Sequence, residues 1–307
     1  MRSAIVVTLE YAQAFLFLVY YWIKALLRTL FVQNVPKNVR GEIILVTGAG
    51  SGLGRGTAKR LASLGATVVL WDVNERGNEE TKQQILNEWP DAKVYSMKVD
   101  LCNREDIYRV AQQVRDQVGD VTIVINNAGV VSGKPLLDLD DASIQRTFDV
   151  NIIAHFWVLK SFLGPMLASN RGHIVTIASG AGIFGVGKLT DYCSSKYAAI
   201  GLHDSLTAEL KQQKKDGVHT TVICPVFINT GMFHGVRASA ASVEVLDENY
   251  VCDSIVDAIR KNKRLVMLPP HTTLFYILKG LLPDECLDRF MNFFGLSTAM
   301  DTFVGRK

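Results

Sequence analysis

The sequence lacks the features that mark a disulfide-rich or metal-binding protein. Its five cysteines are scattered, and no two have the Cys-x-x-Cys spacing of metal or redox sites. An odd and scattered set favours reduced thiols that face the cytosol. The acceptor sequence for N-glycosylation, Asn-x-Ser/Thr, is also missing, which agrees with that side of a membrane. We therefore expect reduced cysteines and no metal site.

The sequence also has no large excess of positive or negative charge. Lys and Arg number 33 against 30 Asp and Glu, a formal net charge of +3. Because nucleic acids recruit strongly basic surfaces, we do not expect a nucleic acid as partner. The chain has no internal repeat and no low-complexity segment. Its 307 residues, 48% of them hydrophobic, suit one large globular domain with extensions.

The N-terminal segment, residues 1–35, is almost free of charge. No charged residue lies between Tyr11 and Ile23, and the apolar stretch reaches about Val32 if the cations within it turn outward. At 100° per residue, the polar members of the segment fall on one arc of a helix. They are Glu10, Gln13, Tyr20, Tyr21, Lys24 and Arg28. The segment predicts a hydrophobic anchor with a polar stripe.

Two membrane arrangements fit this anchor. It can lie in one leaflet or on a lipid-droplet monolayer, or residues 4–32 can span a bilayer, which takes about 20 apolar residues. In a span, the basic residues after its centre would place the following domain in the cytosol. A cleaved signal peptide is disfavoured because no small-residue cleavage site precedes Pro36. A core helix of a soluble domain is the remaining alternative. Pro36 and Gly41 indicate a linker.

From residue 42 onward, short apolar runs alternate with amphipathic stretches. Strands are predicted over residues 42–47, 66–72, 93–100, 121–129, 172–179, 219–225 and 265–269. Helices are predicted over residues 54–65, 78–89, 104–119, 145–168, 191–214 and 250–262. This alternation predicts an α/β fold with a doubly wound, Rossmann-like parallel sheet over residues 36–270. An apolar C-terminal extension, residues 271–307, would follow.

The loop after the first predicted strand is rich in glycine. It reads TGAGSGLG, Thr47 to Gly54, and departs from Gly-x-Gly-x-x-Gly because Leu53 occupies the last glycine position. Backbone amides and a helix N-terminus can approach a pyrophosphate closely where no Cβ intervenes. The loop therefore indicates dinucleotide binding, although a simple glycine-rich turn would read the same way.

Polar residues end the next predicted strands. A carboxylate at Asp72 would accept hydrogen bonds from a ribose 2′-hydroxyl and repel a 2′-phosphate, which favours NAD over NADP. NADP stays possible because the charge of Arg55 can compensate. Asp100 ends the third strand, where a side chain can reach the adenine, and NNAG, Asn126 to Gly129, can border the adenosine after the fourth.

A tyrosine and a lysine one helical turn apart, Tyr192 and Lys196, follow Ser179 in the sequence. The glycine loop, NNAG and this Tyr-x-x-x-Lys pattern, in that order, resemble the short-chain dehydrogenase/reductase superfamily over residues 41–270. The resemblance implies a catalytic set of Asn151, Ser179, Tyr192 and Lys196.

In this set Tyr192 would be the general acid/base, and the nearby ammonium of Lys196 would lower the pKa of its phenol. Lys196 would also bind the nicotinamide ribose, and Ser179 would stabilise charge on the substrate oxygen. Asn151 would hold the helix geometry and a relay water. The implied cofactor set comprises Gly48, Ser51, Gly52, Leu53, Gly54, Asp72, Asp100, Leu101, Asn127, Tyr192, Lys196, Pro225 and Thr230. One departure is Val226, where many members have glycine after the proline.

A narrower resemblance is carried by GEIILVTGAGSGLGR, TFDVNIIAHFWVLKSFLGPM and the ending AMDTFVGRK. These stretches resemble the epidermal retinol dehydrogenase branch, which includes the 17-beta-hydroxysteroid dehydrogenases of types 11 and 13. The resemblance implies an N-terminal anchor on the endoplasmic reticulum or lipid droplets, and a homodimer. The cysteines and the basic residues of the anchor favour a catalytic domain that faces the cytosol.

The substrate pocket is expected from residues 180–189 and 227–246, which are largely apolar. Residues 271–296 can pack at its entrance, touch the membrane or merely cover the core. An apolar pocket beside an anchor favours a hydrophobic alcohol or carbonyl substrate. We expect NAD-dependent oxidation of an alcohol such as all-trans-retinol. Alternatives are a steroid or other lipid alcohol, NADPH-dependent carbonyl reduction, and a lipid-droplet coat protein with secondary activity.

Overall fold

The computed structural model describes residues 4–31, 35–236, 245–296 and 298–305. Residues 237–244 of the expected pocket wall lie outside this part, as do Val32 of the anchor and the last two residues of the quoted ending. The side chain of Arg28, assigned to the polar stripe, is not described either. The chain divides into two units, residues 1–37 and 38–307.

The first unit is one long helix, α1 (Ala4–Phe31). Its stretch Ile5–Leu27 is long and apolar enough to cross a membrane, and none of it is buried in the structure. Large apolar side chains stand in the open, with Leu16 68% and Trp22 69% exposed. A helix of 28 residues is about 42 Å long at 1.5 Å per residue, more than a hydrocarbon core of about 30 Å. Length and composition thus make α1 a candidate membrane span.

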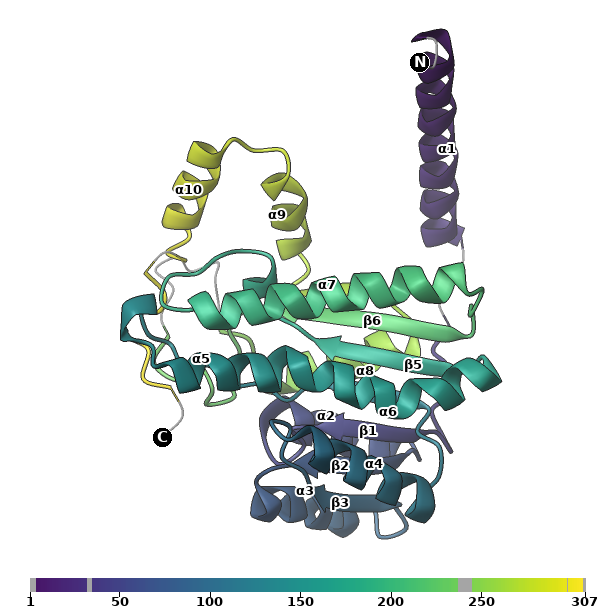
Figure 1. The fold of residues 1–307 in the computed structure, drawn as a ribbon, viewed down its shortest axis with the longest axis vertical. Helices are drawn as coiled ribbons and strands as arrows, with labels where there is room; N and C mark the ends of the chain where they lie inside the picture. Colours follow the sequence, from purple (N-terminus) through teal and green to yellow (C-terminus); the bar gives the residue numbers. More distant parts are fainter. Residues whose placement is uncertain (1–3, 32–34, 237–244, 297, 306–307) are drawn as a thin grey trace. The chain divides into compact units, whose positions relative to one another are not determined.

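The second unit is built on a seven-stranded parallel sheet with the order β3-β2-β1-β4-β5-β6-β7 (Figure 1). The strands are β1 (Ile43–Thr47), β2 (Thr67–Asp72), β3 (Val94–Lys98), β4 (Ile123–Asn126), β5 (Gly172–Ile177), β6 (Val218–Pro225) and β7 (Leu265–Leu268). The central strands are rich in Val and Ile and buried on both faces, as parallel strands require. The predicted doubly wound α/β fold is confirmed.

Helices cover both faces of the sheet. They are α2 (Gly52–Ser63), α3 (Glu75–Glu88), α4 (Arg104–Gln117), α5 (Asp141–Phe148), α6 (Ala154–Ser169), α7 (Thr190–Gln212) and α8 (Glu248–Arg260). One core lies under α2, α3 and α8, through residues such as Leu61, Ile85 and Ile255. The other lies under α4, α6 and α7, through residues such as Val110 and Phe162. The strand order reverses between β1 and β4, where a doubly wound sheet opens its ligand crevice.

The helix predicted over residues 145–168 is present as one run of helix, Asp141–Ser169, but it is not α-helical throughout. Between α5 and α6 the chain forms a π-helical segment, Asp149–Ile153. Such segments widen a helix by one residue per turn and often mark functional sites. Asn151 lies in the middle of this one and is fully buried.

The C-terminal extension contains two short helices, α9 (Thr272–Lys279) and α10 (Asp284–Phe293). They form a helical hairpin that stands beyond the sheet near α7 (Figure 1). Aromatic side chains hold the hairpin together, with the ring centroids of Phe275 and Phe294 5.4 Å apart. Residues 298–305 then return to the body of the unit.

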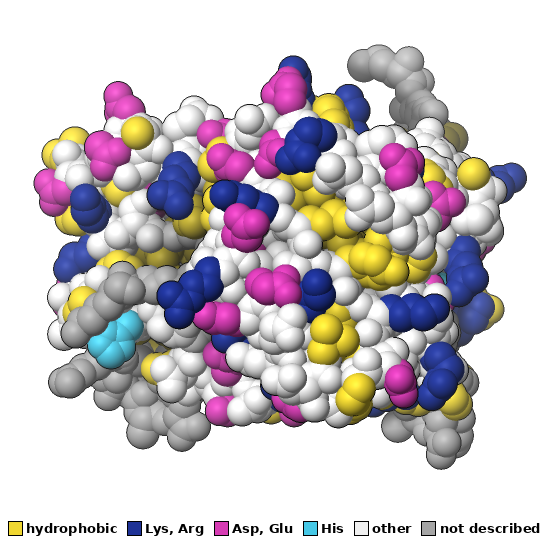
Figure 2. Space-filling view, turned by 90° about the horizontal axis from the view of Figure 1, so that it is seen from below, with side chains coloured by type: hydrophobic (Ala, Val, Ile, Leu, Met, Phe, Trp, Pro, Cys, Tyr) yellow, Lys and Arg dark blue, Asp and Glu magenta, His cyan; other side chains and the backbone are white. Residues whose placement is uncertain are grey.

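Figure 2 shows the unit from the end of the sheet where β3 lies. On this face Lys and Arg side chains are interspersed with Asp and Glu side chains. Among the described residues in that view, neither sign of charge forms a continuous patch.

Candidate active site

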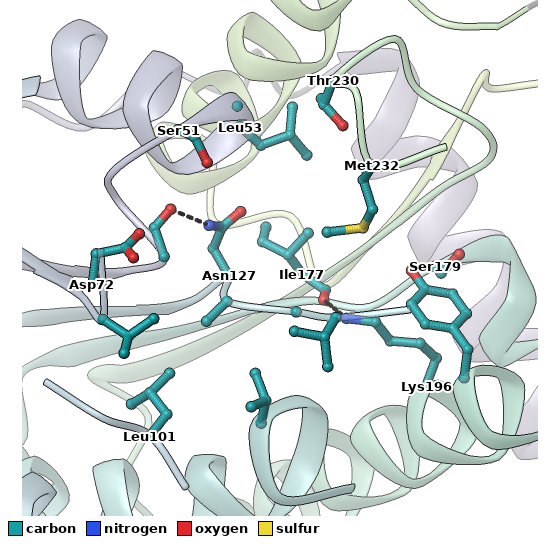
Figure 3. Close-up of a pocket in the computed structure, with 18 of the residues that line it drawn as sticks. Ser51, Leu53, Asp72, Leu101, Asn127, Ile177, Ser179, Lys196, Thr230 and Met232 are labelled. Atoms are coloured by element: carbon teal, nitrogen blue, oxygen red, sulfur yellow. Dashed lines mark hydrogen bonds between the residues drawn. The ribbon is translucent and has the colours of Figure 1, made fainter. Parts of the chain in front are cut away.

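A cavity of about 420 Å³ opens at the carboxyl ends of the central strands. It runs from Asp72 past Asn127 to Ser179 and Lys196, with Met232 on the opposite side (Figure 3). Every residue of the cofactor set predicted from the sequence lines this cavity except Gly54. A parallel sheet brings these residues together because its strand ends meet at one edge.

The glycine loop between β1 and α2 forms one wall. Gly48 has a φ of +67°, and a Cβ there would lie 2.8 Å from the Cα of Ala128. Gly52, where α2 begins, has a φ of +52°. Gly54 lies behind the loop, where a Cβ would lie only 2.1 Å from the carbonyl oxygen of Gly48. Gly54 therefore shapes the loop from behind and does not face the cavity.

Asp72, at the end of β2, faces the cavity and holds the glycine loop. Its Oδ2 accepts a hydrogen bond from the amide of Gly50 at 2.8 Å, and its Oδ1 accepts one from the amide of Asn74 at 2.8 Å. Arg55 does not line the cavity. Its guanidinium donates to the carbonyl oxygens of Gly50 and Gly77 and to Thr81 Oγ1, at 2.5, 3.1 and 2.9 Å. The positive charge that could have compensated Asp72 thus points elsewhere.

The NNAG segment after β4 is tied to the same loop. Asn127 Nδ2 donates to the carbonyl oxygen of Thr47 at 2.8 Å and to that of Gly48 at 3.3 Å, and the bond to Gly48 is drawn in Figure 3. The amides of Asn127 and Ala128 donate to Thr47 Oγ1, at 3.0 and 3.1 Å. These hydrogen bonds fix the NNAG segment to the start of the glycine loop.

The loop after β6 begins with Val226, where many family members have glycine, and is still bonded to the end of β7. The amide of Val226 donates to the carbonyl oxygen of Leu268 at 2.9 Å, which continues the sheet pairing past Pro225. Val226 and Thr230 both line the cavity. A Cβ at Gly52 would lie 3.5 Å from the Cβ of Thr230, so Thr230 sits over the glycine loop.

Tyr192 and Lys196 are buried near the start of α7, with 4% and 3% of their surfaces exposed. Both line the cavity together with Ser179, which follows β5. Lys196 Nζ lies 5.7 Å from the centroid of the Tyr192 ring and donates to the carbonyl oxygen of Ile177 at 2.9 Å (Figure 3). Ser179 Oγ accepts from the amide of Ala181 at 3.1 Å.

Asn151 supports this group from outside the cavity. Its Oδ1 accepts from the amide of Val130 at 2.8 Å, while its Nδ2 donates to the Val130 carbonyl oxygen and to Ser195 Oγ, both at 3.0 Å. Asn151 Oδ1 and Lys196 Nζ both approach Gly129, within 3.5 and 3.6 Å of the place a Cβ would occupy. The π-helical segment turns the amide of Asn151 toward the NNAG strand end.

Ser195 belongs to the site although no motif in the sequence marks it. Its buried hydroxyl accepts from Asn151 and donates to the carbonyl oxygen of Tyr192 at 2.7 Å. It joins the π-helical segment to the turn of α7 that carries Tyr192. A polar residue between a tyrosine and a lysine on one helix is too common a pattern to reveal this role.

Burial dominates the ionisation of the two central groups. It raises the pKa of Tyr192 well above its usual value, and a hydrogen bond with Ser179 offsets only part of this rise. Burial also lowers the pKa of Lys196 to about 8. The expectation that Lys196 lowers the pKa of Tyr192 is therefore not met in the protein alone, because Lys196 Nζ is bonded to Ile177 and desolvation outweighs its charge.

Aromatic side chains form the apolar end of the site. Phe233 lines the cavity, and its ring centroid lies 5.7 Å from that of Tyr192, 5.5 Å from Phe227 and 6.4 Å from Phe303. Of the described residues expected at 227–246, Ile228, Thr230, Met232 and Phe233 line the cavity, and the others do not. Residues 180–189 do not line this cavity. They lie along α7, where a Cβ at Gly182 would meet the backbone of Lys196 at 2.7 Å.

The C-terminal tail, residues 298–305, packs behind this aromatic end. Met300 is buried in the same cluster as Tyr192, and the amide of Val304 donates to the carbonyl oxygen of His234 at 2.9 Å. The ring of Phe303 lies so close to Gly133 that a Cβ there would meet it at 2.1 Å. The sequence offered only a resemblance at AMDTFVGRK and no signal that this ending reaches the site.

Comparison with known proteins agrees with this geometry. The family model for short chain dehydrogenase matches residues 42–241. The short-chain dehydrogenase/reductase family 16C member 6 of Bos taurus is 44% identical over 92% of this chain and 90% of that protein. Epidermal retinol dehydrogenase 2 of Homo sapiens is 44% identical over 92% and 93%, and human 17-beta-hydroxysteroid dehydrogenase 13 is 42% identical over 93% and 95%. The branch predicted from the sequence is confirmed.

A solved structure agrees as well. The crystal structure of a short chain dehydrogenase/reductase from Burkholderia phymatum in complex with NAD superposes with a TM-score of 0.72. It is 26% identical, and the match covers 82% of this chain and 96% of that one. The chain thus belongs to the short-chain dehydrogenase family and is an oxidoreductase that depends on a nicotinamide cofactor.

Proposed function

We propose that this chain oxidises a hydrophobic alcohol, with all-trans-retinol as the first candidate, and passes the hydride to NAD. The observation that carries the proposal is the meeting of Ser179, Tyr192 and Lys196 with a glycine-lined cofactor cradle in one cavity. Hydride acceptance is the chemistry that a nicotinamide cofactor would supply when held in this cavity. The residues of this chain bind and orient the reactants and move the proton.

The cavity fits a dinucleotide with an unmodified ribose. The glycine loop runs close against Ala128 at Gly48 and below Thr230 at Gly52, so neither position places a side chain beside the N-terminus of α2. Asp72 would accept a hydrogen bond from the 2′-hydroxyl, and its charge would repel a 2′-phosphate. Among the described residues that line the cavity, the basic ones are Arg146 and Lys196. Since Arg55 is engaged elsewhere, NAD is favoured over NADP.

The proton would pass through Tyr192. Ser179 would hold the substrate oxygen by a hydrogen bond while Tyr192 takes the hydroxyl proton. Lys196, whose pKa is lowered to about 8, would share the relay and bind the ribose. Because burial keeps Tyr192 protonated at neutral pH, oxidation should speed up as the pH rises, and the reverse reduction should slow down.

The apolar walls support a lipid-soluble substrate. Met232, Phe233 and Ile228 line the cavity near the catalytic side chains. The relatives carry the names of retinol and 17-beta-hydroxysteroid dehydrogenases, and flat hydrophobic alcohols suit an aromatic wall. A steroid alcohol is the second candidate.

We also propose that α1 anchors the protein on the endoplasmic reticulum or a lipid droplet, with the catalytic unit in the cytosol. The unburied apolar surface of Ile5–Leu27 supports this placement, because such a surface is not stable in water. A homodimer through α6 and α7 is proposed in addition. Phe156 on α6 and Tyr197 on α7 are 43% and 40% exposed, which leaves apolar surface for such a contact.

A substrate panel tests the proposal. The full chain, in vesicles or detergent, would be incubated with retinol or estradiol and with NAD or NADP, and formation of the reduced cofactor would be followed. We expect retinol with NAD to give the highest kcat/KM. Activity with estradiol alone would favour the steroid candidate, and no turnover of any lipid alcohol would contradict the proposal.

A further inference from the structure

The end of α9 is attached to the loop that follows Ser179. The carbonyl oxygen of Ile183 accepts hydrogen bonds from Lys279 Nζ and from the hydroxyl of Tyr197. Lys279 Nζ also donates to the Tyr197 hydroxyl at 2.6 Å. A side chain at the last position of α9 thus meets α7 and the loop at one atom.

The ammonium of Lys279 is surrounded by several polar and aromatic groups. Its Nζ lies 4.9 Å from the ring centroid of Tyr197 and 5.6 Å from that of Phe184. Within the described part of the chain, its contacts are a carbonyl, a hydroxyl and two ring faces, with no carboxylate among them. A cation held by several fixed groups fixes their relative positions more firmly than a surface ion pair does.

Ile183 is close to the catalytic residues through the chain. Ser179 caps the 3₁₀ turn η3 (Gly180–Gly182) by accepting the amide of Ala181, and Ile183 ends that turn. The amide of Ile183 donates to the carbonyl oxygen of Gly180 at 3.0 Å. A displacement of the Ile183 carbonyl would therefore change the geometry of the turn that orients the hydroxyl of Ser179.

The same atom is linked to α7. Tyr197 follows Lys196 directly, and Gly182 packs on the carbonyl oxygen of Lys196, where a Cβ would lie 2.7 Å away. The turn is thus clamped between the helix that carries Tyr192 and Lys196 and the end of α9. We name Lys279, Tyr197 and the carbonyl of Ile183 the latch.

We propose that Lys279 is a positioning residue, which through the latch holds the Ser179 turn against α7 in the reactive geometry. The proposal rests on the proposed oxidation at Ser179, Tyr192 and Lys196. Lys279 touches none of the reacting atoms and acts through Ile183 and Tyr197. Two hydrogen bonds from Thr272 to the carbonyl oxygen of Pro269 fix the start of α9. The latch fixes the other end of this helix.

The latch also gives α9 an influence on the site. Leu274, Ile277 and Leu281, on and just after this helix, are 56%, 54% and 74% exposed. Whatever displaces α9 would strain the bonds of Lys279 first, and through them the Ser179 turn. Loss of the latch is expected to lower kcat. The NADH dissociation constant should stay the same, because the glycine loop lies at the other end of the cavity.

The test compares Lys279→Ala with two other variants of the full chain. Lys279→Arg keeps a cation that can donate to Ile183 and stack on Tyr197, and Lys261→Ala removes the lysine just after α8 that pairs with Asp257. We expect Lys279→Ala to lower kcat for the alcohol about tenfold, with an NADH dissociation constant within about twofold of the wild type. Lys279→Arg should recover most of the loss, and Lys261→Ala should behave as the wild type.

A split between kcat and the amount of NADH-binding protein separates positioning from a general loss of folded protein. A displaced Ser179 should lower kcat per NADH-binding site, with the number of such sites unchanged. A lower rate that only follows a smaller number of NADH-binding sites would reduce Lys279 to a stability role and overturn the proposal. An unchanged kcat would overturn it as well.

Hydrogen exchange keeps the test independent of the proposed function. Lys279→Ala should speed amide exchange in residues 180–189 and leave α8 unchanged. If the wild type oxidises no alcohol, the proposed function fails, and faster exchange in this loop still supports the latch. Equal exchange in both proteins would contradict the latch whatever the activity.

Discussion

The amide of Gly50 donates a hydrogen bond of 2.8 Å to Asp72 Oδ2, so one carboxylate faces the cofactor cavity and also holds the glycine loop. The contact is close, since a Cβ at Gly50 would lie 2.9 Å from the same oxygen. Asp72 therefore both carries the charge that faces the cofactor and holds the glycine loop in shape. A test of cofactor choice needs a substitution that removes the charge and keeps the loop bond.

Asp72→Asn comes nearest to that requirement, because it removes the charge and keeps one oxygen for the Gly50 amide, while the bond from the Asn74 amide is lost. We expect the ratio of kcat/KM for NAD over NADP to fall about tenfold or more, since the repulsion of a 2′-phosphate is lost. Asp72→Ala should in addition weaken both cofactors, because the loop loses its bond. Steady-state kinetics with both cofactors measure this. An unchanged ratio in Asp72→Asn would sink the ribose argument.

Gly54→Ala should damage cofactor binding without touching the cofactor. The added Cβ would lie 2.1 Å from the carbonyl oxygen of Gly48, so the backbone of the glycine loop would have to move. We expect the NADH dissociation constant, measured by fluorescence, to rise more than about tenfold. Gly164→Ala on α6 is the control, because a Cβ there has nothing within 4 Å and should stabilise the helix by about 0.5–1 kcal/mol. Equal binding by both variants would refute the role of Gly54.

Most of the fold could be predicted because its signals are local. Each of the seven predicted strands contains or overlaps an observed one, since buried parallel strands are continuous apolar runs. The helix over residues 145–168 was predicted without its π-helical segment. That segment depends on bonds from Asn151 to Val130 and Ser195, which join distant parts of the chain and leave no periodic signal.

The site was predictable where residues stand in motifs and hidden where they meet through the fold. Lys196 and Tyr192 are one turn apart in the sequence, and Asp72 ends a strand. Met300 and Phe303 reach the site from the end of the chain, and only tertiary packing brings them there. The direction of the Tyr192 pKa shift was missed because it depends on burial, which the sequence does not contain.

Lys196 should make stability depend on pH. Its pKa falls from a usual 10.5 to about 8 in the folded protein, so between these values the unfolded chain binds more protons and stability rises with pH. Between pH 7.5 and 9.5 the free energy of unfolding should increase by about 2 kcal/mol relative to Lys196→Met, which lacks the charge. Urea unfolding at both pH values measures the difference. Parallel pH curves for the two proteins would contradict the buried, pKa-shifted lysine.

Phe303→Ala should weaken the apolar end of the site. Its ring packs against Phe233 and fills the space over Gly133. We expect a loss of about 1–3 kcal/mol in the free energy of unfolding and a higher KM for the alcohol, with cofactor binding unchanged. Val304→Ala is the control, because that side chain is 60% exposed. If Phe303→Ala leaves KM and stability unchanged, the C-terminal tail has no part in the pocket.

The most direct test of the central claim is NADH formation from retinol by the wild type and by Tyr192→Phe. The substitution removes one hydroxyl and keeps a buried ring of the same shape beside Phe233. If Tyr192 is the acid/base, kcat should fall by about 100-fold or more, while the NADH dissociation constant stays within about twofold. Equal rates of NADH formation by the two proteins would contradict the mechanism.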